Sequence, residues 1–358
     1  MNKGFFGSLD ALLITDPSNI RYLTGFTGVS PNEREAYVLL MHGKTILFTG
    51  RLYTETARRL TRAKRLTFTE ISREHPLSEA LIALTNDEHI SKLGFEDRHL
   101  TVAELSKLKQ TLPHVKLIPT GNKIENLRMI KRADEIINIR KAAALTDECF
   151  THVLKRIRPG VSENSLVWEI ERFFREHGAD NAFSPIVAFG PHTSQPHYYN
   201  APDTQTLLQK NDIVLLDFGA RVNGYCADMT RMAMTGTPKP EWITAYNAVL
   251  SANEKALSLL RDGERNGATL DAAAREVIAE ANLPVYPHSL GHAAGLDIHE
   301  APRLTVHHAE TLMPYMTVTV EPGTYMEGSY GIRIEDLILI QDGAIDVLSA
   351  SSKELPVL

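Results

Sequence analysis

Cysteine is scarce in this chain, long apolar runs are missing, and basic residues are not in excess. The 358 residues include only Cys149 and Cys226, neither in a zinc-type spacing, which favours reduced thiols over a disulfide framework. No stretch approaches the roughly 20 apolar residues of a membrane span, and no secretory signal opens the chain. The net charge of -6 excludes the basic surface that nucleic acid demands. We therefore expect a cytoplasmic protein with no membrane or nucleic-acid partner.

The length of the chain predicts two domains. Residues 1–120 alternate short strand-like and helix-like segments, which indicates a mixed α/β domain. The strand-like segments are Ala11–Ile14, Ala36–Leu40, Thr45–Phe48, Leu93–Phe95 and Val115–Ile118, and the helix-like ones are Tyr53–Leu60, Pro76–Leu84 and Val102–Leu112. Because residues 119–126 resemble a linker, we place the domain boundaries at 1–125 and 126–358.

The second domain repeats one pattern, a long helix, a shorter helix and then an acid-bearing strand pair. The first set comprises Ala133–Ile157, a helix from Ser162 to Gly178, Ile186–Phe189 and Ile213–Phe218. The second comprises Trp242–Arg261, Leu270–Ala281, Met316–Val320 and Ile332–Leu339. The repeat predicts an internally duplicated α+β domain whose site lies where the two halves meet.

Five potential metal ligands follow one another along this domain, and they are Asp217, Asp228, His292, Glu321 and Glu335. Four carboxylates and one imidazole suit two divalent cations, which indicates hydrolytic chemistry. Taken singly, each residue has an ordinary alternative. The aspartates could lie on a solvated hairpin, each glutamate on the surface, and the histidine in a structural position.

The dipeptide Asn223-Gly224 predicts a two-residue type I′ hairpin turn. In that register Val222 faces Tyr225 and Gly219 faces Asp228. Asp217 lies two residues before Gly219, so it shares the face of Asp228 as a diagonal neighbour. Two aspartates converging on a buried face repel each other unless cations lie between them.

The second half gives weaker local signals. Glu321 and Glu335 hold places analogous to the aspartates, but the loop Met326–Gly331 is too long to fix a register, so their convergence is inferred. His292 lies in Gly-His-Ala-Ala-Gly, where the small neighbouring residues allow the backbone to approach a bound ligand closely. One imidazole among carboxylates gives a mixed shell suited to manganese, cobalt or zinc.

The ligand order resembles that of the pita-bread metallopeptidases of family M24, which include methionine aminopeptidase, aminopeptidase P, prolidase and the metal-free creatinase. The motifs are the two aspartates, the histidine, Glu321-Pro-Gly and Arg333-Ile-Glu-Asp336. Residues 19–28 and 127–131 resemble the aminopeptidase P, prolidase and creatinase branch. The resemblance implies a creatinase-type N-terminal domain before a pita-bread catalytic domain. Methionine aminopeptidases lack that first domain, and five intact ligands disfavour creatinase-like chemistry.

The resemblance also implies a role for each site residue. Asp217 would chelate one metal, His292 and Glu321 the other, and Asp228 and Glu335 would bridge both. The catalytic group would comprise His197, His288, His299, Glu321 and Arg333. His197 and His299 match substrate-contacting and transition-state-stabilising histidines, and Glu321 would also shuttle a proton. The departures, Gly-His-Ala-Ala-Gly, Pro191-His192 and Thr49-Gly50-Arg51, touch no ligand, so they bear on substrate detail only.

The implied activity is an Xaa-Pro aminopeptidase that uses two divalent metals, with Mn²⁺ expected and Co²⁺ or Zn²⁺ as alternatives. Its partners would be short proline-containing peptides and a second copy of the chain in a homodimer. An Xaa-Pro dipeptidase (prolidase) is the first alternative, because the sequence does not show what binds the substrate's C-terminal carboxylate. The others are a non-peptide C–N hydrolase and a non-catalytic binding module, the latter disfavoured because no ligand is lost.

Overall fold

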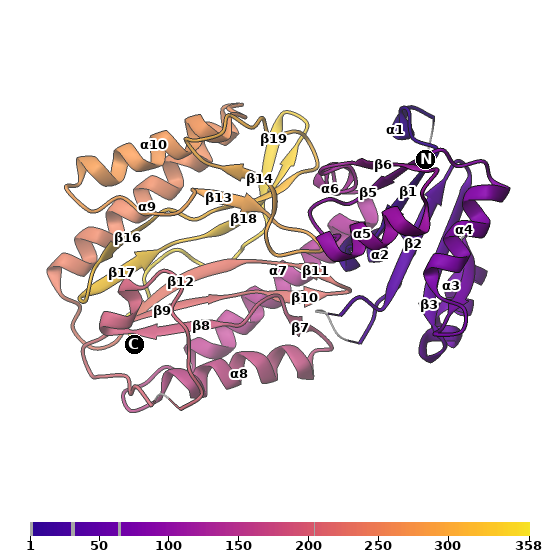
Figure 1. The fold of residues 1–358 in the computed structure, drawn as a ribbon. Helices are drawn as coiled ribbons and strands as arrows, with labels where there is room; N and C mark the ends of the chain where they lie inside the picture. Colours follow the sequence, from indigo (N-terminus) through magenta and orange to yellow (C-terminus); the bar gives the residue numbers. More distant parts are fainter. Residues whose placement is uncertain (1–2, 30–32, 64–65, 204) are drawn as a thin grey trace. The chain divides into compact units, whose positions relative to one another are not determined.

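The structure is a computed structural model that describes residues 3–29, 33–63, 66–203 and 205–358 (Figure 1). The chain forms two compact units, Met1–Leu127 and Arg128–Leu358, which divide two residues after the predicted domain boundary. None of the helices in the described ranges has the length and apolar character that crossing a membrane requires.

The first unit is built on a six-stranded mixed sheet in the order β4-β3-β2-β1-β5-β6. Its strands are β1 (Ala11–Ile14), β2 (Ala36–Met41), β3 (Lys44–Gly50), β4 (Thr67–Ile71), β5 (Lys92–Phe95) and β6 (Lys116–Pro119). Its helices are α1 (Lys3–Phe6), α2 (Pro17–Thr24), α3 (Thr54–Ala63), α4 (Leu77–Asp87) and α5 (Val102–Thr111), and α6 (Glu125–Met129) follows. The predicted strand and helix segments of this domain are confirmed, with ends shifted by a few residues.

Strand β1 shows why this sheet is buried on both faces. Alternate residues of a strand point to opposite faces, and Leu12 and Ile14 join one apolar cluster while Ala11 and Leu13 join another. Helices α2 and α3 contribute Ile20 and Ala57 to the first cluster, and α4 and α5 contribute Leu81 and Leu108 to the second. The sheet is therefore sandwiched between two pairs of helices.

The second unit contains two pairs of helices with strands between them (Figure 1). The helices are α7 (Ala133–Leu154), α8 (Glu163–Glu176), α9 (Pro240–Arg261) and α10 (Gly267–Glu280). The strands of the first half are β7 (Asp180–Asn181), β8 (Ile186–Phe189), β9 (Ile213–Phe218), β10 (Ala220–Val222), β11 (Tyr225–Cys226) and β12 (Met229–Met234). Those of the second half are β13 (Gly291–Ala293), β14 (Glu300–Leu304), β15 (Thr317–Val320), β16 (Gly323–Met326), β17 (Tyr330–Arg333), β18 (Asp336–Gln341) and β19 (Ala344–Val347).

The two halves of this unit match in length and order. Helices α7 and α9 have 22 residues each, and α8 and α10 have 14 each. A hairpin follows each helix pair, β9 to β12 in the first half and β15 to β18 in the second. In Figure 1, α7 and α8 lie on one side of these strands and α9 and α10 on the other. The predicted duplicated α+β domain is present in this arrangement.

Local signals set two of the helix starts. The Ser162 side chain accepts a hydrogen bond from Ser165 N and so caps the start of α8. Pro240 occupies the first turn of α9, where the N–H that proline lacks would have no partner in the helix.

The predicted strand Ile332–Leu339 is wrong as a single element, because it is interrupted at residues 334 and 335 between β17 and β18. The paired strand carries Pro322, which has no N–H to donate to Ile334 O. Glu335 N donates to Thr230 O in the other half of the domain, at 3.1 Å. The interruption therefore joins the two halves at a predicted metal ligand.

Candidate metal centre

The first hairpin brings Asp217 and Asp228 to one site. Asn223 and Gly224 have φ values of 49° and 86°, the left-handed pair of a type I′ turn. Val222 pairs with Tyr225 as predicted, and Asp217 pairs with Thr230 in the β9–β12 ladder. Both pairings belong to one register, which places Gly219 opposite Asp228.

Gly219 is required at that position by close approach. A Cβ atom there would lie 1.8 Å from Ala227 O, an impossible contact with backbone. The hairpin therefore closes beside Asp228 only because residue 219 has no side chain.

The second hairpin places Glu321 and Glu335 opposite each other. Val320 pairs with Asp336 on one side of the break, and Gly323 pairs with Arg333 on the other. These two pairings also share one register, which sets Glu321 against Glu335. The register that loop length could not fix is thus defined by the ladders on both sides.

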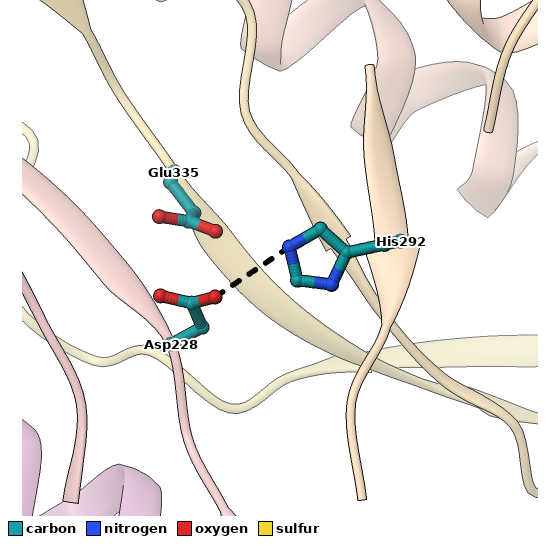
Figure 2. Close-up of side chains that lie close together, drawn as sticks. All are labelled: Asp228, His292 and Glu335. Carbon is teal, nitrogen blue, oxygen red and sulfur yellow. Dashed lines mark ion pairs between the residues drawn. The ribbon is translucent and has the colours of Figure 1, made fainter. Parts of the chain in front are cut away.

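Asp228, His292 and Glu335 converge on one buried point (Figure 2). Each offers a ligand atom, and these atoms all lie within 4.8 Å of one another. His292 Nε2 lies 3.6 Å from Asp228 Oδ2, the pair joined by the dashed line, and 3.3 Å from Glu321 Oε1. One imidazole nitrogen therefore faces carboxylates from both halves of the domain.

The His292 ring is oriented as a ligand. Its Nδ1 lies 3.2 Å from Ala293 O, which can only accept, so we assign the ring proton to Nδ1. Burial and the charge of His299 lower the pKa of His292 to about 3, which keeps the ring neutral. The Nε2 lone pair is thus free to face a cation. Gly291 allows this strand to approach its neighbour, because a Cβ there would lie 2.0 Å from Thr319 O.

All four carboxyl groups resist ionisation in the cluster. Burial and the charge of Glu335 raise the pKa of Asp228 well above its usual range. Burial and the charge of Glu321 do the same to the pKa of Glu335. Burial raises the pKa of Glu321 to about 7, and it raises that of Asp217 in spite of Arg333. Bound positive charge would therefore favour the ionised form of all four carboxyl groups.

Asp217 has one oxygen paired and one free. Arg333 Nη2 lies 2.5 Å from Asp217 Oδ2. Among the described residues, the buried Asp217 Oδ1 has no hydrogen-bond partner. An unpaired buried carboxylate oxygen is costly unless a ligand satisfies it.

The three remaining predicted histidines surround the cluster. The His299 ring lies edge-on to the His292 ring, with centroids 4.4 Å apart. His288 Nδ1 lies 4.0 Å from Glu321 Oε2, and burial lowers the pKa of His288 to about 4. His197 is exposed, and its charge lowers the pKa of Asp217. The structure therefore brings every predicted site residue to one region.

Two hydroxyl residues in the site were missed from the sequence. Tyr325 OH accepts from Arg333 Nη1 at 2.9 Å and lies 3.0 Å from His288 Nε2. Thr230 Oγ1 accepts from Arg333 Nε and donates to Glu335 Oε2 at 2.8 Å. The only sequence signal was position, because Tyr325 follows the Glu-Pro-Gly motif and Thr230 follows Asp228 by two residues.

These donors fit divalent cations. A site of this composition, four carboxylates and one neutral imidazole, is a mixed oxygen and nitrogen shell. Cations would satisfy the free Asp217 Oδ1 and offset the repulsion that raises the carboxyl pKa values. The geometry therefore supports a metal centre shared by the two halves.

Comparison with known proteins agrees with this geometry. Residues 137–342 match the metallopeptidase family M24, and residues 7–130 match the creatinase/prolidase N-terminal domain. An uncharacterized peptidase of Bacillus subtilis is 34% identical over 99% of this chain and 98% of its own length. The chain belongs to metallopeptidase family M24.

Solved structures of this M24 fold extend over nearly the whole chain. An Xaa-Pro dipeptidase from Bacillus anthracis is 34% identical, with a TM-score of 0.87 and coverage of 98% of this chain and 95% of that one. An X-Pro aminopeptidase from Thermotoga maritima is 28% identical, with a TM-score of 0.87 and 98% coverage of both chains. A prolidase from Pyrococcus horikoshii is 28% identical, with a TM-score of 0.86 and coverage of 97% and 96%. The predicted creatinase-type and pita-bread domains are confirmed, as is a metallopeptidase that acts on peptides.

Proposed function

We propose that this M24 peptidase is an exopeptidase that hydrolyses the bond between the first residue and a proline in short peptides. The observation that carries the proposal is the buried convergence of Asp228, His292 and Glu335 from opposite halves of the domain. The similarity to an Xaa-Pro dipeptidase, an X-Pro aminopeptidase and a prolidase supports the choice of proline peptides.

Two divalent cations would be held by five residues. We assign Asp217 to one ion, His292 and Glu321 to the other, and Asp228 and Glu335 as bridges between them. We expect manganese, with cobalt or zinc as alternatives, because the ligand shell mixes oxygen and nitrogen. When bound, such ions lower the pKa of water and polarise a carbonyl, which is the chemistry that amide hydrolysis needs.

The protein's own groups would handle protons and charge. Glu321, whose Oε1 lies 3.3 Å from His292 Nε2, would take a proton from the nucleophile and return it to the proline nitrogen. His299 is a candidate donor to the oxyanion, because it is exposed and its ring centroid lies 4.4 Å from that of His292. His197 would contact the substrate, His288 would be a further active-site histidine, and Arg333 would hold Asp217 in place.

One observation favours dipeptides among the substrates. Arg303 pairs with His292 across β13 and β14, and its side chain is exposed. Its positive charge lowers the pKa values of both His292 and His299, so it lies within electrostatic range of the cluster. An exposed cation beside the site could bind the C-terminal carboxylate of a dipeptide. An Xaa-Pro dipeptidase is therefore the second candidate.

Three substrates separate these candidates. Ala-Pro, Ala-Pro-Ala and a nonapeptide beginning Ala-Pro would each be assayed with added Mn²⁺. Turnover of the longer two supports an aminopeptidase, and turnover of Ala-Pro alone supports a dipeptidase. Arg303→Gln should raise KM for Ala-Pro about 10-fold or more while leaving the nonapeptide unaffected, because one charge-assisted hydrogen bond is worth about 1.5–3 kcal/mol. Failure on all three peptides, with metal bound, would leave a non-peptide C–N hydrolase.

Other parts of the proposal rest on the sequence. Residues 1–125 would be the N-terminal domain and residues 126–358 the catalytic domain. A cytoplasmic location and a homodimer remain predictions.

A further inference from the structure

Asn253 is a fully buried amide in the middle of α9 that contacts both glutamate-bearing strands. Its Nδ2 donates to Val320 O at 3.0 Å and to Ile334 O at 3.5 Å. Val320 and Ile334 directly precede Glu321 and Glu335 in the sequence. One side chain is therefore bound to the backbone just before two candidate metal ligands.

This contact lies where the sheet is interrupted. Regular pairing ends at Val320 with Asp336 and resumes at Gly323 with Arg333. Within the interruption, Glu321 N donates to Leu290 O and Glu335 N to Thr230 O, so neither N–H joins the two strands. Ile334 N donates to Pro322 O across the strands, at 3.4 Å, and the Asn253 amide adds a second link through the carbonyls of Val320 and Ile334.

Lys353 fixes the orientation of that amide. Its Nζ lies 2.9 Å from Asn253 Oδ1 and 3.1 Å from Asp336 Oδ2. Because an ammonium group can only donate, Oδ1 must face Lys353 and the NH₂ group must face the two carbonyls. Asp336 directly follows Glu335 and also accepts from Arg231 Nη2 at 2.6 Å. The backbone around Glu335 is thus held on both sides.

The other half of the domain uses the same helix position. Asn253 and Thr146 each lie thirteen residues after the first residue of their 22-residue helices, α9 and α7. Thr146 Oγ1 is buried and accepts from Ala220 N at 2.9 Å, where β9 gives way to β10. In each half, a polar side chain of the long helix therefore forms a hydrogen bond with the backbone where the strand is interrupted near the candidate ligands.

We propose that Asn253, oriented by Lys353, is a positioning residue that sets the separation of Glu321 and Glu335 and thereby the affinity for divalent metal. The inference rests on the proposed metal centre and adds to it a determinant outside the ligand shell. Asn253 acts through the carbonyls of Val320 and Ile334, because its contacts are with backbone and with Lys353.

The test is Asn253→Asp, which keeps the shape but replaces the donor with an acceptor that repels both carbonyls. Titration calorimetry with Mn²⁺ should show affinity reduced by about 10- to 100-fold, the usual effect of losing a group that supports a ligand. The visible absorption spectrum of the Co²⁺-loaded protein should change as well, because it reports ligand geometry. Neither measurement involves a substrate.

Two control variants separate positioning from general damage. Asn247→Asp makes the same chemical change at an exposed position of α9 and should bind Mn²⁺ like wild type. Val249→Ala removes buried apolar volume from α9 and should lower thermal stability without reducing metal affinity. Mn²⁺ affinity in Asn253→Asp within about twofold of wild type, or an equal loss in Val249→Ala, would overturn the proposal.

If Asn253→Asp does not fold, Lys353→Met serves as the second variant. This variant keeps the Asn253 amide but removes the hydrogen bond from Lys353 that orients it, so Mn²⁺ affinity should fall. Unchanged affinity would overturn the inference. A wild-type protein that binds Mn²⁺ but cleaves no Xaa-Pro peptide would overturn the proposed function alone.

Discussion

Asp228 and Glu335 share a buried site in which each added negative charge makes the next ionisation harder. The charge of Glu335 raises the pKa of Asp228, and the charges of Glu321 and Asp217 raise the pKa of Glu335, in both cases after the larger effect of burial. Such a cluster binds protons when it lacks cations and releases them when cations bind. Metal binding and folding stability should therefore both depend on pH.

The first prediction concerns this linkage. Folding raises the pKa of Glu321 from 4.5 to about 7, so its contribution to stability is present below pH 4.5 and is lost as pH rises through 7. The metal-free protein should lose this contribution between those values, and Mn²⁺ should restore stability most where the carboxylates are ionised. Differential scanning fluorimetry should show a larger Mn²⁺-induced increase in Tm at pH 8 than at pH 5.5. The same increase at both pH values would contradict the prediction.

The second prediction concerns His299. His299→Ala should lower kcat for Xaa-Pro peptides by about 10²–10³-fold, because it would remove a donor to the transition state. Metal content, measured by mass spectrometry, should stay at the wild-type level because the ring is not assigned as a ligand. His308→Ala, an exposed histidine on the same segment, is the matched control and should retain activity. Loss of metal from His299→Ala would show that the assignment is wrong.

At the scale of residues, the sequence identified groups that stand in distinctive local contexts. The five ligands, the three histidines and Arg333 were found because each lies in a motif. Tyr325, Thr230 and Asn253 were not found, because their roles arise from contacts across the fold. The hydrogen bond from Thr230 to Glu335, for instance, joins residues that lie 105 positions apart.

At the scale of elements, hairpin register decides whether the acids converge. A two-residue turn leaves no freedom, so Asn223-Gly224 by itself determines the pairing of Val222 with Tyr225. The loop after Met326 gives no such constraint, and the register there comes from contacts on both sides of the break. Pro322-Gly323 signals a break after Glu321, but local sequence did not show the matching break at residues 334 and 335, where Glu335 N bonds to Thr230 O of the other half.

The third prediction tests the first hairpin. Gly219→Ala would place a Cβ atom 1.8 Å from Ala227 O, so the strands must separate beside Asp228. We expect a loss of about 3 kcal/mol in the free energy of unfolding, the upper range for overpacking, together with weaker Mn²⁺ binding. Denaturant unfolding and metal titration would measure the two effects.

The matched control is Gly50→Ala, where φ is −75° and the new Cβ would have 4.0 Å to Ile71 O. That variant should stay within about 0.5 kcal/mol of wild type. Equal stability in the two variants would contradict the packing argument for Gly219.

At the scale of the whole molecule, the duplication explains why the centre needs the complete second unit. Asp217 and Asp228 come from the first half, and His292, Glu321 and Glu335 come from the second. The order of helices and strands along the sequence predicted this division, because it depends only on periodicity and length. Sequence could not show which side chains hold the halves together, since those contacts are tertiary.

The last prediction follows from that division. The cluster identified among the described residues lies in Arg128–Leu358 and draws on both of its halves. Ligand binding slows the local opening of segments that it holds together. Mn²⁺ should therefore slow amide hydrogen exchange in β9 and β12 as well as in β15 and β18, and leave β1 and β2 unchanged. Hydrogen-exchange mass spectrometry with and without Mn²⁺ measures this, and protection confined to one half would show that the metal is held by that half alone.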